Sequence, residues 1–106
     1  DRGRPLTVAY SGGTAFNFVN TIDNFQIYID SQKKMGAMVE ATKATVMMSN
    51  HTEFDDAVKK IKMMAARKPG EPHPFELGQE AVARYFKTTE GCARVAQIKL
   101  QQAEKQ

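Results

Sequence analysis

One short segment, residues 44–49, constrains the fold more than any other part of the chain. It is rich in β-favouring residues and stops at Asn50-His51-Thr52. Successive side chains of a strand point to opposite faces, yet Val46, Met47 and Met48 are all apolar. We therefore predict a strand that is covered on both of its faces, as in layered α/β proteins.

The rest of the chain predicts helices around this strand and one further strand. Apolar residues at three- and four-residue spacing indicate a helix over residues 22–41, for which Thr21 is a good N-cap. In the proline-rich connection 71–75, Phe75 is expected to act as an anchor. The predicted elements are a strand over 6–10, a helix over 22–41, a strand over 44–49, a helix over 55–67 capped by Thr52 or Asp55, and a helix from Gln79 onward that Thr88, Thr89 and Gly91 could divide in two.

These elements predict a single α/β domain over residues 1–106, in the order strand, helix, strand, helix, helix. A chain of 106 residues with 42% hydrophobic residues can bury one modest core. Three helices can shield one face of the sheet, which leaves no element for the second apolar face of the strand predicted at residues 44–49. We therefore expect either a fragment of a larger fold or an obligate assembly with a second copy.

Charge, hydropathy and cysteine content exclude several classes of function. The net charge of +3 comes from basic residues spread along the sequence, so no nucleic-acid partner is expected. Apolar runs such as Val46 to Met48 are far shorter than the roughly 20 residues of a membrane helix, so no membrane partner is expected either. Cys92 is the single cysteine, and its place on the predicted apolar stripe of the last helix predicts that it is buried.

His51 is the candidate functional residue, because it stands where the buried strand ends. In α/β sheets this is the edge at which ligands collect. A lone histidine in a Ser-Asn-His-Thr turn is also commonly a solvated or capping residue, so position alone leaves both interpretations open. Glu53, Asp55 and Asp56 follow closely and are assigned to the first turn of the next helix, where carboxylates interact well with the helix dipole.

Two further features favour structural roles. The segment Ser11 to Thr14 lacks the Gly-x-x-x-x-Gly-Lys pattern of phosphate-binding loops, so its glycines are assigned to a sharp exit from the strand with a close backbone approach. His73 lies between two prolines and is too remote in sequence from His51 to form a short-spaced zinc motif with it. His73 is therefore expected at the surface.

Three segments together resemble the C-terminal part of metallo-β-lactamases. They are Tyr10-Ser11-Gly12-Gly13-Thr14-Ala15-Phe16-Asn17, the helix that begins Asp23-Asn24-Phe25, and Val46-Met47-Met48-Ser49-Asn50-His51. The nearest match is the third subclass of these zinc enzymes and its close relatives. The similarity continues through Arg67-Lys68-Pro69-Gly70-Glu71-Pro72-His73-Pro74-Phe75 into the last helix, and so covers nearly the whole chain.

The resemblance implies that the chain is the second half of an αββα sandwich, the C-terminal part of a larger metallo-hydrolase. It places His51 at the family's C-terminal zinc ligand, which completes the second of two zinc sites. The family's His-x-His-x-Asp-His motif belongs to the earlier half and is absent here. In the complete enzyme a zinc-bound hydroxide would open a small-molecule β-lactam or a related amide or lactone. The isolated chain is expected to be inactive, and the parent periplasmic or secreted.

Two departures from the family pattern bear on the substrate. Many of these lactamases have Pro after the ligand histidine and a Cys shortly before the strand, paired with a Cys in the last helix; here Thr52 and Ala44 occupy those positions. Cys92 would be the unpaired remnant of that bridge, which favours a related hydrolase over a true drug-degrading lactamase. The alternative function is a self-associating, non-catalytic module that forms a homodimer through its exposed sheet face.

Overall fold

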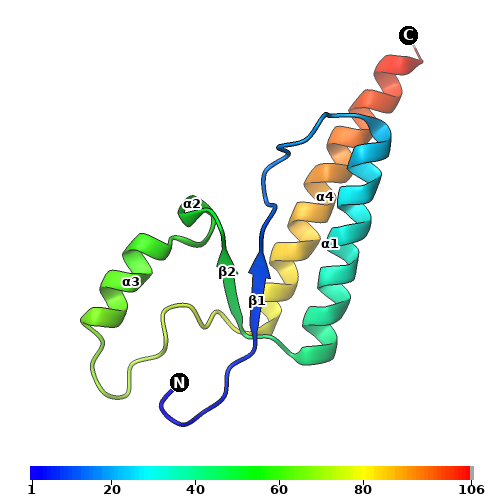
Figure 1. The fold of residues 1–106 in the computed structure, drawn as a ribbon. Helices are drawn as coiled ribbons and strands as arrows, with labels where there is room; N and C mark the ends of the chain where they lie inside the picture. The colour runs from blue at the N-terminus through cyan, green and yellow to red at the C-terminus, as the bar shows by residue number, and fades with distance from the viewer. Residues whose placement is uncertain (106) are drawn as a thin grey trace.

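The sheet consists of two parallel strands joined by a long helix (Figure 1). The computed structural model describes residues 1–105. Val8 pairs with Val46 and Ser11 with Ser49, so both strands end at the same edge. The elements in chain order are β1 (Val8–Ser11), α1 (Ile22–Thr42), β2 (Val46–Ser49), α2 (Thr52–Asp55), α3 (Ala57–Ala65) and α4 (Gln79–Glu104).

Helix α1 has a capping residue at each end. The hydroxyl of Thr21 accepts a hydrogen bond from the backbone N–H of Asn24 (3.1 Å), which confirms the predicted N-cap. Lys43 adopts the left-handed conformation (φ 54°), and its N–H donates to the carbonyl of Val39. This cap turns the chain directly into β2.

Helix α4 is continuous over 26 residues, so the threonines and the glycine in its middle do not divide it. Thr89 is buried, and its hydroxyl contacts the Phe86 carbonyl (3.0 Å) and the Gln32 side-chain oxygen on α1 (2.7 Å). The buried residues of α4 are Val82, Phe86, Thr89, Ala93 and Gln97. Cys92 lies beside this row and is exposed, so the prediction of a buried Cys92 was wrong.

The predicted helix 55–67 is broken near its start. A four-residue helix, α2, ends at Asp55, and Asp56 is in the left-handed region (φ 56°) before α3 begins at Ala57. The carboxylate of Asp55 accepts hydrogen bonds from the backbone N–H groups of Ser49 and Ala57. These two contacts fix the turn between β2 and α3, which a continuous helix could not make.

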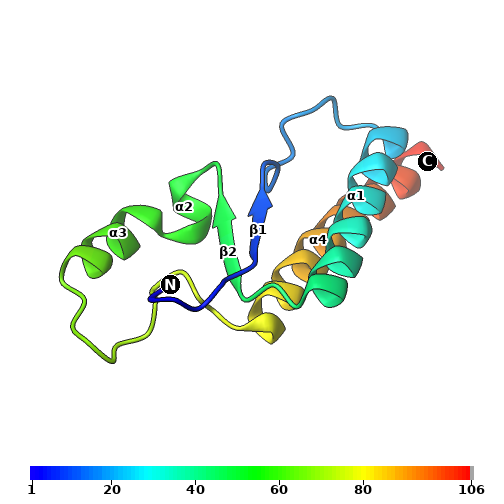
Figure 2. The ribbon, with the colours of Figure 1, turned by 60° about the horizontal axis from the view of Figure 1, so that its bottom comes forward.

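Helices α1 and α4 run antiparallel and pack on one face of the sheet (Figures 1 and 2). The core between them and the sheet contains Ala9 and Met47 from the strands and Val39, Val82 and Phe86 from the helices. A second cluster lies near the start of α1, where Phe16 and Phe18 of the loop meet Phe25 and Tyr28 edge-on or tilted. The two rings of the loop thus pin it to α1.

The opposite face of the sheet is covered over β2 and bare over β1. Val46 is buried against Ala57 of α3 and against Phe75, which is the anchor predicted for the 71–75 connection. The expectation that helices lie on one face only, with nothing for the other, was therefore wrong at Val46. Over β1 the same face is bare, since Val8 and Tyr10 are 48% and 58% exposed.

The chain has more solvent-accessible surface than an average compact monomer of its mass. Its accessible surface is 7079 Å², whereas a monomer of 11.8 kDa exposes about 5,900 Å². Its radius of gyration is 16.5 Å, against about 13 Å for a compact domain of this length. The excess of about 1,200 Å² goes with an elongated shape, 60 × 28 × 16 Å along its principal axes. Within residues 1–105 none of the helices has the apolar length needed to cross a membrane.

Candidate functional site

His51 lies at the carboxyl edge of the parallel sheet, two residues beyond the end of β2. The backbone N–H of Asn50 donates to the carbonyl of Ser11 (3.1 Å), and the Asn50 side-chain amide donates to the carbonyl of Gly12 (3.1 Å). These bonds tie the turn that carries His51 to the loop that follows β1. The edge where ligands collect in α/β sheets is thus built from both strands.

The imidazole of His51 is exposed and does not cap the helix that follows it. The backbone N–H of His51 donates to the hydroxyl of Ser49 (3.2 Å). The ring meets Phe54 edge-on, with 5.8 Å between the ring centroids. Among residues 1–105 no hydrogen bond engages either ring nitrogen of His51, so both can meet an external ligand.

A hollow of about 390 Å³ lies beside His51. It has neutral walls: its lining contains hydroxyl, amide and aromatic side chains and no Lys, Arg, Asp or Glu. The lining residues are Gly12, Gly13, Thr14, Ala15, Asn17, Phe18, Tyr28, Ser31, Gln32 and His51. A Cβ added at Gly12 or Gly13 would meet no atom within 4 Å, so the predicted close backbone approach at these glycines was wrong.

The loop that forms one wall of this hollow is held by hydroxyl groups. The side-chain oxygen of Thr14 hydrogen-bonds the hydroxyl of Tyr85 on α4 and lies 3.3 Å from the hydroxyl of Ser11. The hydroxyl of Tyr28 donates to the Thr14 carbonyl (3.1 Å). Burial, followed by the proximity of Tyr85, raises the pKa of Tyr28, so its phenol stays protonated as the donor. Sequence reasoning missed this network, because both tyrosines fit the apolar spacing of their helices.

The carboxylates that follow His51 have structural positions. Asp55 is buried and accepts from the N–H groups of Ser49 (2.7 Å) and Ala57 (3.0 Å). It therefore holds the N–H of the first residue of α3, but it lies at the end of α2 and not in the first turn of α3, whose N-cap is Asp56. Glu53 and Asp56 are exposed at the surface of the turn.

His73 lies in the connection before α4, which bridges β2 at its first residue, Val46, whereas His51 follows the last residue of β2. It is half-buried rather than at the surface as predicted, and its Nδ1 accepts a hydrogen bond from the N–H of Phe75 (3.2 Å). Burial, and then the nearby Arg67, lowers the pKa of His73. The structure therefore does not bring the two histidines together.

The side chains present do not complete a zinc site. Among residues 1–105 no three His, Cys, Asp or Glu side chains gather where they could hold a metal ion. Structural zinc takes four protein ligands and catalytic zinc usually three plus water. His51 can supply one imidazole donor at the sheet edge, and any further ligands would have to come from outside the described residues.

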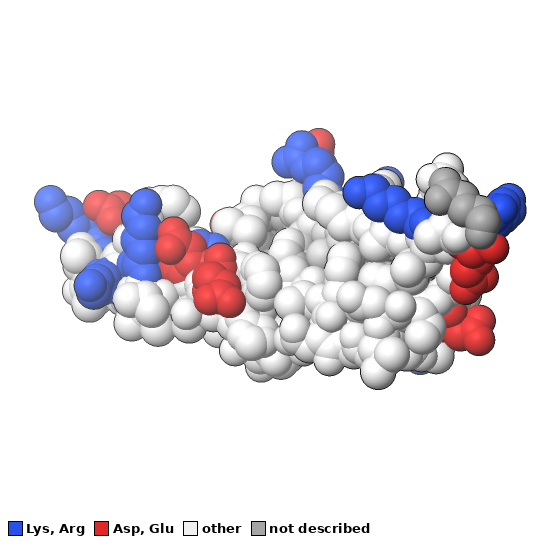
Figure 3. Space-filling model, turned by 90° about the horizontal axis from the view of Figure 1, so that it is seen from above, with Lys and Arg blue, Asp and Glu red and all other residues white. Residues whose placement is uncertain are grey.

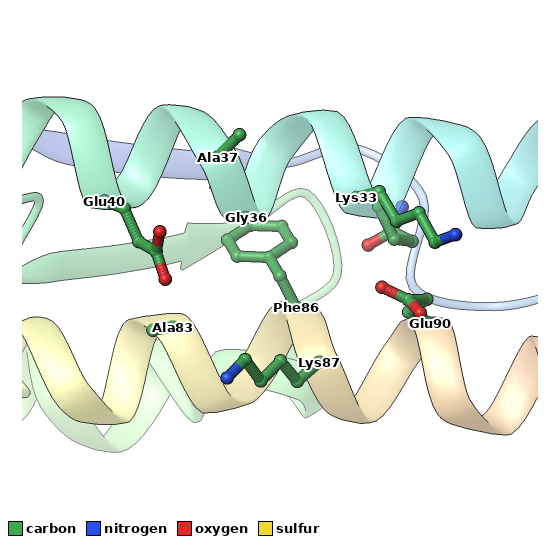
Figure 4. Close-up of a pocket in the computed structure, with 9 residues that line it drawn as sticks. Lys33, Gly36, Ala37, Glu40, Ala83, Phe86, Lys87 and Glu90 are labelled. Atoms are coloured by element: carbon green, nitrogen blue, oxygen red, sulfur yellow. The ribbon is translucent and has the colours of Figure 1, made fainter.

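A second hollow, of about 250 Å³, lies between α1 and α4 (Figure 4). The ring of Phe86 extends from α4 toward Gly36 on α1, and Lys33, Glu40, Lys87 and Glu90 surround it. This hollow contains neither histidine nor cysteine. It contains none of the residues predicted to carry chemistry.

The surface around the carboxyl edge of the sheet is largely uncharged. Residues 5–22 contain no Lys, Arg, Asp or Glu. Figure 3, which looks onto this edge, shows a broad uncharged area with most of the charged side chains toward the two ends of the molecule. No family model, curated protein or solved structure matches the chain. The likeness to metallo-β-lactamases therefore rests on the sequence motifs.

Proposed function

We propose that the chain is the C-terminal half of a zinc-dependent hydrolase of the metallo-β-lactamase type, in which His51 supplies one zinc ligand. The observation that carries this proposal is the position of His51. Its imidazole is exposed at the carboxyl edge of a parallel sheet, and a neutral hollow lies beside it. That arrangement is expected of a metal ligand placed next to a substrate-binding space.

Three further observations support the proposal. The bare face over β1 and the excess surface fit a layer whose neighbour lies in the missing half of the same fold. The hollow, about 390 Å³, has the size of a site for a small molecule such as a β-lactam, a related amide or a lactone. Both carboxylate oxygens of Asp55 accept backbone hydrogen bonds, so this residue serves the turn rather than a metal ion. By the same family likeness, the parent would be periplasmic or secreted.

The test uses the intact gene product and two matched histidine variants. We expect about two zinc ions per polypeptide, as a complete site of this type requires, and one fewer in His51→Ala. Hydrolysis of a chromogenic cephalosporin or of a lactone should fall by about 100-fold or more, because even residues behind metal ligands change activity by 10–100-fold. His73→Ala should keep both ions, since His73 lies at the opposite end of the sheet. Full zinc content in His51→Ala would refute the assignment.

The 106-residue chain itself provides a second test. With added zinc it should show no hydrolysis above its own His51→Ala variant, because one imidazole cannot hold and activate the ion. Stoichiometric zinc binding together with hydrolysis by the isolated chain would overturn the half-enzyme proposal.

A further inference from the structure

Gln32 of α1 is a buried polar residue on the wall of the hollow beside His51. The residue is only 8% exposed, and its side-chain oxygen accepts a hydrogen bond from the Thr89 hydroxyl (2.7 Å). Among residues 1–105 its amide nitrogen donates to no protein acceptor. In the same part of the chain every fully buried side-chain N or O atom has a partner, so this nitrogen reaches accessible surface.

Gln32 borders two hollows, one beside His51 and one between α1 and α4. The lining of the first contains no charged side chain. The second is surrounded by Lys33, Glu40, Lys87 and Glu90 (Figure 4). We assign the free amide nitrogen to the first, because there it lies in the same hollow as the proposed zinc ligand. This assignment rests on the proposed function, which makes that hollow the space for the substrate.

The other polar side chains of this wall are less suited to hold a ligand in one position. The hydroxyls of Tyr28 and Ser31 both donate to backbone carbonyls of the chain itself (3.1 and 2.9 Å). Asn17, the second amide of the lining, is exposed. Gln32 is therefore the side-chain donor that burial and a hydrogen bond fix in place.

We infer that the amide N–H of Gln32 binds an uncharged carbonyl oxygen of the substrate, such as an amide or a lactone presents. A donor that is already held in position loses little conformational freedom when the ligand binds. A carboxylate in the same place would leave water without a cation to pair with, because the lining contains no Lys or Arg. The site therefore selects a neutral amide or lactone group over a free carboxylate.

The experiment measures binding of N-methyl-2-piperidone to the intact gene product by amide nuclear magnetic resonance. This probe is an uncharged cyclic amide that can only accept hydrogen bonds. The resonances of Gly12 and Gly13, which line the hollow, should shift and saturate, with a dissociation constant in the millimolar range expected of so small a ligand. Gly36, which lines the other hollow, should not shift. A shift at Gly36 instead, or no saturable shift at Gly12 and Gly13, would overturn the inference.

Two glutamine variants separate binding from stability. Gln32→Met removes the donor and should raise the dissociation constant about three- to tenfold. Gln97→Met is the matched control, because Gln97 is buried between the same two helices and hydrogen-bonds across them without lining the hollow. It should lower the urea midpoint but leave the dissociation constant unchanged. The same constant in the wild type and Gln32→Met, or an equal loss in both variants, would contradict the role of Gln32.

Cyclohexanecarboxylate, a ring of the same size with a charged group, tests the substrate class on the wild-type protein. Zinc is first removed with a chelator, since zinc itself binds carboxylates, and circular dichroism checks the fold. At about pH 8, well above the ordinary pKa of an imidazole, the carboxylate should bind at least about tenfold more weakly than the amide. Equal or tighter binding would refute the neutral substrate class. The zinc content of His51→Ala tests the proposed function separately, so the two failures are distinguishable.

Discussion

Asp55 should be the most stabilising polar residue of the turn that carries His51. Its buried carboxylate accepts from the N–H groups of Ser49 and Ala57, so Asp55→Ala leaves two backbone donors without a partner. Each such donor costs about 1–3 kcal/mol. We expect the free energy of unfolding to fall by about 3 kcal/mol, which corresponds to a loss of about 15 °C in Tm for a domain of this size.

Urea unfolding followed by circular dichroism would measure this loss. Asp55→Asn keeps one acceptor oxygen and should cost about half as much, which gives a measurable value if the alanine variant does not fold. Glu53→Ala, on the exposed side of the same turn, should change stability by less than about 0.5 kcal/mol. If Asp55→Ala cost under about 1 kcal/mol, or no more than Glu53→Ala, the two hydrogen bonds would not hold the turn and the reasoning would fail.

Three further variants test other parts of the fold. Arg67 forms a bidentate ion pair with Asp1 (2.8 Å), and both side chains are about one tenth exposed. Arg67→Met should lower the free energy of unfolding in urea by about 3 kcal/mol. The control Arg84→Met removes an exposed ion pair and should lower it by less than about 0.5 kcal/mol. The fold lowers the pKa of His73, so the unfolded chain binds more protons, and stability should decrease as the pH falls through about 6.5 toward the lower folded value. A His73→Gln variant should lose that part of the pH dependence when urea midpoints are compared. Phe86→Ala empties a fully buried site between α1, α4 and the sheet, and should cost about 3–5 kcal/mol; a change under about 1 kcal/mol in calorimetry would contradict the core described above.

The elements with strong local signals were predictable from the sequence. Helix α1 was predicted over 22–41 and extends over Ile22–Thr42, because its apolar spacing and its Thr21 cap are both local features. The strand predicted over 44–49 appears as Val46–Ser49. Of the three apolar residues that defined it, Val46 and Met47 are buried as expected, and Met48 is partly exposed.

The errors arose where partners distant in sequence decide the structure. Hydropathy assigned Cys92 to the buried side of α4, but the row that meets α1 includes Thr89 and Gln97. Thr89 donates a hydrogen bond to Gln32, and Gln97 donates one to Gln26 (3.0 Å). Hydrogen-bonded polar pairs therefore lie at the helix interface, where a hydropathy pattern predicts apolar residues. The sequence contains no sign of these pairs.

The candidate site was predictable in part. The end of the apolar strand located His51, because the carboxyl edge of a parallel sheet is a general property of the fold class. The hydroxyl network of Thr14, Tyr28 and Tyr85 was not predictable, since it joins the loop after β1 to two helices. The break at Asp56 was likewise hidden, because a left-handed non-glycine residue is selected by its surroundings.

The parallel pairing of β1 with β2 has a consequence for the time course of folding. All of α1 lies between the two strands, so β1 pairs with a strand that is distant in the sequence. Such non-local pairing is slow compared with helix formation. During refolding, β1 therefore remains a single uncharged strand for longer than the helices remain unfolded. The recovery of folded chain should accordingly decrease as the protein concentration during refolding increases.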